Sequence, residues 1–340
     1  MAGSEEDDIL YHIGAAYVQA GEVKKAIGYF EKALQKNPTN ENALYELGFF
    51  SDMRGDYQKS IDYYNRYLDI DPFNYSTWFN LGITFNKAGD YKKAIDAYEY
   101  VLALDENFDQ ALFNIGNAHA NNGEYIKAIK KYIEFLEIQP DNDDAYCYIG
   151  ECYLNLQDYR KAEIYYQEAI KLNKENESAW FGAGLIMWIE KKYAESVIFI
   201  KKALKIDNSN PEYWLTLARV YNDDNQPKEA EKAVKKAAKL EPENSEIWLT
   251  AADVYEKFGE KENALSIMQT GVKKNNDVQL KYRLVGLLLE CKQEEEAYKW
   301  LRKSLVQDDL KVDYLYEMYP NAKKNKRVSK IISRFKKLNN

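Results

Sequence analysis

The sequence has few of the residues from which catalytic and metal sites are built. Its 340 residues include only three cysteines, Cys147, Cys152 and Cys291, and two histidines, His12 and His119. No spacing among the cysteines matches a zinc or redox motif, and the two histidines are too isolated for a dyad or a metal cluster. We therefore expect no enzymatic activity, metal, cofactor or small-molecule substrate. The cysteines should be reduced, buried thiols, and His119 should be a hydrogen-bonded core residue.

A long apolar run is also missing. No stretch approaches the roughly 20 apolar residues that span a membrane. The N-terminus, MAGSEEDD, is acidic and has neither the basic nor the apolar region of a signal peptide. The chain is thus expected to be cytoplasmic, unless a targeting segment precedes it.

Charge is unevenly distributed along the chain. The formal net charge is −8, but residues 320–340 contain eight Lys and Arg and no acid, which leaves −16 for residues 1–319. An acidic body does not suit a phosphate backbone. Only the basic tail is suited to nucleic acid or an anionic membrane.

What the sequence does contain is a repeat of 34 residues. Eight units run without insertion over residues 7–278, and we number each unit from 1 to 34. Position 8 is small in every unit, and position 20 is alanine or serine. A glycine inside a helix costs about 1 kcal/mol, so its recurrence predicts that a second helix passes close by. The residues at position 8 are Gly14, Gly48, Gly82, Gly116, Gly150, Gly184, Ala218 and Ala252, and Gly286 continues the count.

Turn and capping residues recur in the same register. Glycine is frequent between the two helices of a unit, where it ends the first helix. Proline at position 32 in four units stops the second helix. Asparagine at position 34 in six units is placed to cap the next first helix. These are Asn40, Asn74, Asn142, Asn176, Asn210 and Asn244.

Together these positions resemble the tetratricopeptide repeat (TPR) family. The motif W-x-x-L-G-x-x-Y…A-x-x-x-F…P is met by residues 78–82 with Phe85, Ala94 and Tyr98. The resemblance implies an all-α fold, a right-handed superhelical solenoid of antiparallel helix pairs with a C-terminal capping helix. It also implies that partners bind the concave wall built from the first helices.

The register divides the chain into four segments. Residues 1–6 are an N-terminal extension, 7–278 are the eight repeats, 279–310 are a degenerate ninth repeat, and 311–340 are C-terminal capping helices with the basic tail. In the ninth unit Ala297 comes one residue early, which predicts a shortened turn. The tail is expected to form two short helices parted by Pro320, the second with one apolar face. That face consists of Val328, Ile331, Ile332, Phe335 and Leu338.

The sixth repeat contains the stretch WFGAGLIMWIEKKY, which is apolar at almost every position. The register exposes Leu185 and Ile189 on the wall, with Trp188 beside them, and an exposed apolar patch usually marks an interaction site. Alternatively, these residues pack against each other in a local distortion, and the aromatic residues at position 5 pack between adjacent helices. The predicted partner-binding residues are Phe79, Phe113, Phe181, Leu185, Trp188, Ile189 and Arg219.

The wall around this patch is mixed but acidic, which favours a partner segment with Lys or Arg beside apolar anchors. The carboxylate clamp of chaperone-adaptor TPR proteins is not expected. Asn80, Asn114 and Asn117 occupy clamp positions, but none of the basic members is present, so a bound carboxylate would be unpaired.

We therefore predict a non-catalytic scaffold that binds an extended or helical segment of a protein partner in its concave groove, as a monomer or weak homo-oligomer. Two alternatives are less favoured. One is self-association through the same patch, and the other is membrane or nucleic-acid association through the basic C-terminal helix.

Overall fold

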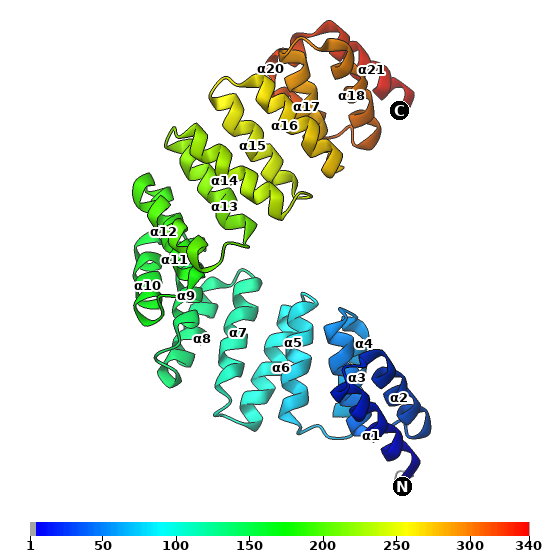
Figure 1. The fold of residues 1–340 in the computed structure, drawn as a ribbon. Coiled ribbons are helices and arrows are strands. Elements are labelled where there is room, and N and C mark those ends of the chain that lie inside the picture. The colour runs from blue at the N-terminus through cyan, green and yellow to red at the C-terminus, as the bar shows by residue number, and fades with distance from the viewer. Residues whose placement is uncertain (1–4, 340) are drawn as a thin grey trace. The chain divides into compact units, whose positions relative to one another are not determined.

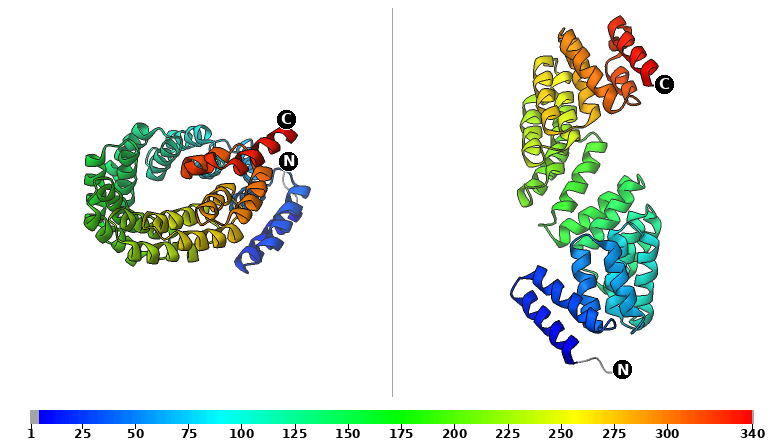
Figure 2. Two further views of the ribbon diagram at one scale, coloured as in Figure 1. Left: turned by 90° about the horizontal axis from the view of Figure 1, so that it is seen from above. Right: turned by 90° about the vertical axis from the view of Figure 1, so that its right-hand side faces the viewer.

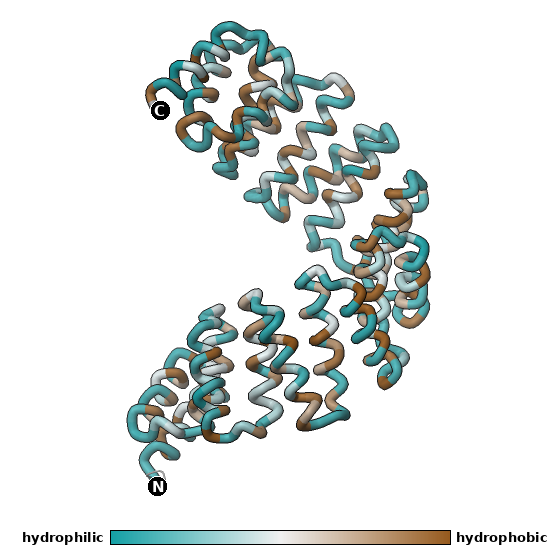
Figure 3. Tube along the Cα trace, turned by 180° about the vertical axis from the view of Figure 1, so that it is seen from behind, coloured by the Kyte–Doolittle hydropathy of each residue, from teal (hydrophilic) through white to brown (hydrophobic). Residues whose placement is uncertain are grey.

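The computed structural model describes residues 5–339, and all regular elements in this range are helices (Figure 1). The chain divides into two compact units, Met1–Leu172 and Asn173–Asn340. Within each unit, consecutive helices pack side by side as antiparallel pairs (Figure 2). Apolar and polar residues alternate along these helices (Figure 3), because each helix buries only part of its surface.

The first unit contains five helix pairs. They are α1 (Glu5–Gln19) with α2 (Val23–Lys36), α3 (Glu41–Met53) with α4 (Tyr57–Leu68), α5 (Tyr75–Lys87) with α6 (Tyr91–Leu104), α7 (Asp109–Asn121) with α8 (Tyr125–Ile138), and α9 (Asp143–Asn155) with α10 (Tyr159–Leu172).

The second unit contains four pairs and three further helices. The pairs are α11 (Glu177–Ile189) with α12 (Tyr193–Ile206), α13 (Pro211–Asp223) with α14 (Pro227–Leu240), α15 (Ser245–Lys257) with α16 (Lys261–Lys274), and α17 (Val278–Glu290) with α18 (Glu294–Gln307). The remaining helices are α19 (Val312–Met318), α20 (Pro320–Lys324) and α21 (Lys326–Asn339).

The predicted asparagine caps are confirmed. At all six positions the side-chain oxygen accepts a hydrogen bond from a backbone N–H in the first turn of the next helix. These bonds satisfy donors that would otherwise have no partner at the helix start. They also fix where each first helix begins.

The small residue at position 8 lets the second helix of the same pair place a ring directly against the first. In the first unit, a Cβ added to Gly116 would lie 2.5 Å from the ring of Tyr132, and the other four pairs show the same contact. The aromatic side chains are at position 24, and all are nearly or fully buried. They are Phe30, Tyr64, Tyr98, Tyr132 and Tyr166.

The ninth repeat differs from the prediction. Its turn, residues 291–293, is as long as that between α15 and α16, and the missing residue lies in the preceding connection, residues 275–277. Other connections between pairs have four or more residues. The α17 register is therefore displaced by one, so Val285 takes position 8 and Gly286 takes position 9. Gly286 does not face α18, contrary to the count from sequence.

The C-terminal segment also differs from the prediction. Pro320 does not simply separate two helices, because it begins the short helix α20, where a missing N–H costs nothing. On α21, Val328 and Ile332 are buried, whereas Leu338 is 75% exposed. The predicted apolar face is thus only partly covered.

Candidate functional site

Positions 9, 12 and 13 of the first helices lie on one face. We call this face the inner wall. At four junctions a residue at position 12 contacts position 13 of the next first helix. The pairs are Asp52 with Lys87 (2.5 Å), Asn86 with Asn121 (3.4 Å), Trp188 with Asp223 (2.8 Å), and the Asn222 carbonyl with Lys257. These contacts tie successive repeats together along the wall.

Helix α11 buries most of its apolar residues. Phe181 is only 9% exposed and lies 4.4 Å, ring to ring, from Tyr213. Leu185 and Trp188 are half-buried against the core of the second unit, and Ile189 is 44% exposed. We call Leu185, Trp188 and Ile189 the α11 patch.

Polar side chains border the α11 patch. The indole N–H of Trp188 donates to Asp223 Oδ2, which fixes the ring on the wall. Arg219, on the neighbouring helix α13, donates to Glu246 Oε1 at 2.5 Å and to Thr250 Oγ1 at 3.3 Å. Arg219 is therefore already paired, so a carboxylate on a ligand would compete with Glu246 for it.

Phe79 and Phe113 belong to the first unit, and the structure brings them together. Both line a cavity of about 320 Å³ with Asn114 and Asp144. Phe79 also packs on Phe108 at 4.9 Å between ring centroids, and Phe113 packs on Tyr132, Phe135 and Tyr148. The aromatic residues at position 5 therefore take part in packing while one side borders the cavity.

A second cavity in the first unit was not predicted. It measures about 480 Å³ and is polar. Four asparagines line it, Asn86, Asn117, Asn121 and Asn155, all on the inner wall. The recurrence of asparagine at positions 9, 12 and 13 was the signal in the sequence for this cavity. Asparagine is common at exposed positions, so this recurrence alone did not predict a cavity.

The chain's own C-terminal segment occupies the inner wall of the last pairs. A Cβ added to Gly286 would lie 1.9 Å from the Tyr319 ring, so only glycine leaves room for it. The Tyr319 hydroxyl donates to Glu256 Oε1 at 2.7 Å, and burial raises the pKa of this phenol, which keeps it a donor. Beneath the ring, Arg283 is 3% exposed and pairs with Asp253 and Glu256.

The described residues contain no cluster of three or more His, Cys, Asp or Glu side chains that could hold a metal. His119 is buried and hydrogen-bonded to Glu124 at 2.7 Å, which confirms its expected core position. All three cysteines are free. Cys147 and Cys152 are buried as expected, and burial raises the pKa of Cys152 to about 12, whereas Cys291 is only half-buried.

Over residues 5–339, none of the helices combines the length and apolar character that crossing a bilayer requires.

Models of known protein families match the chain from residue 8 to residue 315. Residues 8–75 and 75–108 match tetratricopeptide repeat families, and residues 106–315 match the family described as the Cilia and flagella-associated protein 70 C-terminal domain. No curated protein matches the chain.

Solved structures show the same fold. The APC/C hetero-tetramer Cut9–Hcn1 is similar with a TM-score of 0.54 and 15% identity over 77% of this chain, which spans 58% of the matched chain. A tetratricopeptide repeat protein from Parabacteroides merdae ATCC 43184 is similar with a TM-score of 0.51 and 18% identity, over 83% of this chain and 98% of the other.

The recurring small residues, asparagine caps and paired helices thus agree with the family matches, and the chain belongs to the tetratricopeptide repeat family, with residues 106–315 in the family of the Cilia and flagella-associated protein 70 C-terminal domain.

Proposed function

We propose that the chain binds a segment of a protein partner on the inner wall, with the α11 patch as its anchor site in the second unit and no chemistry of its own. TPR repeats in general form scaffolds for protein interactions. The proposal adds where the partner binds and which side chains hold it.

The exposure of Ile189 carries the proposal. At position 13 of α11 it is 44% exposed, although every other apolar residue of this helix is at least half-buried. Leu185 lies one turn earlier on the same face, and Trp188 adds an aromatic surface. An apolar side chain left open beside a half-buried aromatic ring and a leucine fits an anchor residue of a partner segment.

The charge around the patch favours a cationic residue beside that anchor. Asp223 is exposed next to Trp188. The nearby cation, Arg219, is already paired with Glu246 and is less available to an acidic ligand. A partner segment with an apolar side chain flanked by Lys or Arg therefore suits this part of the wall.

The test is a peptide-display selection on the full chain, run in parallel on Ile189→Glu and on Ile198→Glu. Ile198 is 54% exposed and lies on α12 of the same repeat, so it provides a matched control for placing a charge on an exposed isoleucine. The affinity of the enriched peptides for Ile189→Glu should be about tenfold or more below their affinity for the wild type. Their affinity for Ile198→Glu should equal that for the wild type. Equal binding to all three proteins would remove the α11 patch from the proposal.

Light scattering on the same proteins separates partner binding from self-association. A lighter particle for Ile189→Glu alone would show that the patch joins copies of this chain, and the proposal would then be wrong about its occupant.

A further inference from the structure

A groove lies between α18 and α21 at the C-terminal end of the second unit, and the proposed function does not use it. It has a volume of about 450 Å³ and combines an apolar floor with a cationic rim. The floor consists of Leu305, Ile331, Phe335 and Leu338, and the rim consists of Arg302, Arg327, Lys330 and Arg334.

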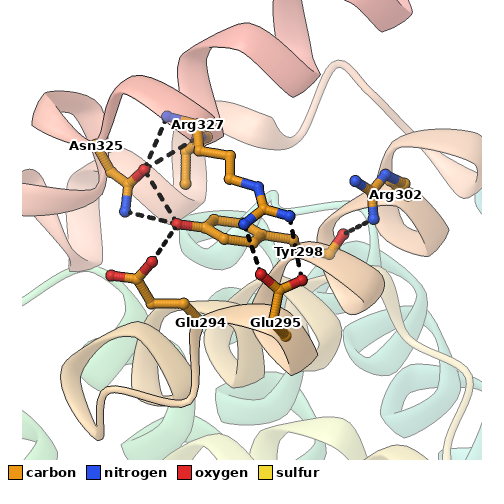
Figure 4. A network of polar contacts seen from close by, with 7 residues as sticks. Glu294, Glu295, Tyr298, Arg302, Asn325 and Arg327 are labelled. Atoms are coloured by element: carbon orange, nitrogen blue, oxygen red, sulfur yellow. Dashed lines mark hydrogen bonds and ion pairs between the residues drawn. The ribbon is translucent and has the colours of Figure 1, made fainter.

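A polar network fixes α21 against α18 and so gives the groove its shape (Figure 4). The guanidinium of Arg327 donates to both carboxylate oxygens of Glu295, at 2.5 and 3.1 Å, and lies 4.5 Å from the ring centroid of Tyr298. The Tyr298 hydroxyl donates to Glu294 at 2.7 Å and accepts from the Asn325 side chain at 3.2 Å. Because both helices are held by these contacts, the groove exists before any ligand binds.

Among the residues that the structure describes, the remaining cations of the rim have no acidic partner. Lys330 and Arg334 are exposed and one turn apart on α21, and neither forms an ion pair with the described residues. Arg302, on α18, donates to the Tyr298 carbonyl, at 3.4 Å, and has no carboxylate partner within residues 5–339. Three cations thus surround the apolar floor in a chain whose residues 1–319 carry a net charge of −16.

The geometry favours a protein segment over a bilayer or a nucleic acid. The side of α21 that carries Val328 and Ile332 is buried in the core of the second unit and is not available to insert into lipid. What remains open is a channel between two helices, and its apolar floor, which includes Leu338 at 75% exposure, offers nothing to a phosphate backbone. A groove of this kind fits the apolar face of an amphipathic helix.

We propose that the groove between α18 and α21 binds an acidic amphipathic segment of a protein partner. Its apolar side chains would lie on Ile331, Phe335 and Leu338, and its Asp or Glu residues would pair with Lys330, Arg334 and Arg302. This site is separate from the inner wall. Its partner would be acidic, whereas the segment proposed for the inner wall carries Lys or Arg.

The test measures binding of a fluorescein-labelled acidic amphipathic peptide of about 15 residues, built from Leu and Glu in a helical pattern. A scrambled peptide of the same composition is its control. Fluorescence anisotropy is recorded for the full chain, for Lys330→Glu/Arg334→Glu, for Leu338→Asp, and for Lys336→Glu/Lys337→Glu. The last variant makes the same change of charge on α21 at residues that do not line the groove, and circular dichroism verifies that all variants keep their helices.

The patterned peptide should bind the wild-type chain and the Lys336→Glu/Lys337→Glu control alike, with affinity reduced about tenfold or more in the other two variants. Equal loss in the control variant, or equal binding of the scrambled peptide, would reduce the effect to general charge attraction and overturn the proposal. Absence of peptide binding would also overturn it. If vesicles with phosphatidylserine or a uridine oligonucleotide then bound instead, the basic helix would be assigned to lipid or nucleic acid.

Discussion

The two units build the same helix pair from different side chains. In the first unit a glycine at position 8 faces an aromatic ring at position 24, as in Gly116 and Tyr132. In the second unit the side chains at position 24 are aliphatic, and position 8 accepts alanine, as in Ala218 with Val234. The corresponding residues are Gly184 with Ile200, Ala218 with Val234, and Ala252 with Met268. In two of these three pairs, Ala218 with Val234 and Ala252 with Met268, a side chain smaller than tyrosine at position 24 accompanies a residue larger than glycine at position 8, and a packed core tolerates such a volume-conserving exchange better than either change alone.

The turns between the two helices of a pair also use different residues in the two units. At position 15 the backbone adopts a positive φ throughout, and four of the five turns of the first unit meet this with glycine. In the second unit the same conformation is held by Lys191 (φ 62°), Asn225 (57°) and Lys292 (60°), with Gly259 the exception. A left-handed conformation is costly for residues with a Cβ, so the second unit carries strain that the first mostly avoids.

Among substitutions that add a single methyl group, the largest effect is expected from Gly116→Ala. The added methyl would lie 2.5 Å from a ring atom of Tyr132, and this overpacking should lower the local free energy of unfolding by about 2 kcal/mol. Hydrogen exchange of α7 and α8 in the full chain measures the loss. Gly184→Ala is the matched substitution in the second unit, where the methyl meets Ile200 Cγ1 at 2.7 Å and the facing side chain is smaller than the Tyr132 ring. A loss of stability as large in α11 and α12 would contradict the idea that the cost depends on the size of the facing side chain.

The next test converts a pair of the first unit into the pattern of the second. Gly116→Ala combined with Tyr132→Val reproduces the pair found at Ala218 and Val234. Tyr132→Val alone should cost about 3 kcal/mol because it leaves a cavity and removes a hydrogen bond to Asn117. The double variant should be more stable than the sum of the two single losses predicts, by about 1 kcal/mol. Strict additivity would mean that the two positions do not compensate each other.

A smaller, stabilising effect is expected from Lys191→Gly. Glycine adopts positive φ without strain, so the substitution should raise the stability of α11 and α12 by roughly 1 kcal/mol. Gly123→Lys, at the equivalent turn of the first unit, should lower the stability of α7 and α8 by a similar amount. Urea unfolding followed by hydrogen exchange reports both, and a loss of stability in Lys191→Gly would show that the lysine contributes more than its backbone strain.

The smallest effect concerns Glu124. Hydrogen bonds from Lys127 and then from His119 lower its pKa to about 2. Because the folded pKa lies below the ordinary value, the carboxylate stabilises the fold above about pH 4.5, and this contribution is lost as the pH falls towards 2. Glu124→Gln should therefore weaken the acid dependence of stability in α7 and α8, measured by thermal melting from neutral to acid pH. An unchanged acid dependence would assign it to other carboxylates.

The sequence predicted the helix pairs and their caps because both follow from local, repeated rules. Asn142 caps α9 as expected, since a cap needs only the next two or three residues. The error in the ninth repeat has a different origin. A deletion of one residue in the loop before α17 cannot be located by counting, because Gly286 and Ala297 each fit one of the two registers.

The candidate site was less predictable than the fold. The register placed Leu185 and Ile189 on the same face, but their exposures differ because packing between repeats depends on the full shapes of the neighbours. The position of Tyr319 on the inner wall could not be predicted at all. It depends on a contact with residues 63 positions earlier in the chain, and no periodic rule extends into the C-terminal segment.

Tyr319 has a consequence for what the second unit can hold. Its ring fills the space above Gly286, and its hydroxyl donates a hydrogen bond to Glu256, so position 9 of α17 is already covered by the chain itself. A segment that binds along α11, α13 and α15 therefore reaches a fixed end at this ring. On the proposed function, Tyr319 would limit the length of the bound segment, and Tyr319→Ala would be expected to lengthen the stretch of the wall that the segment covers rather than to abolish binding.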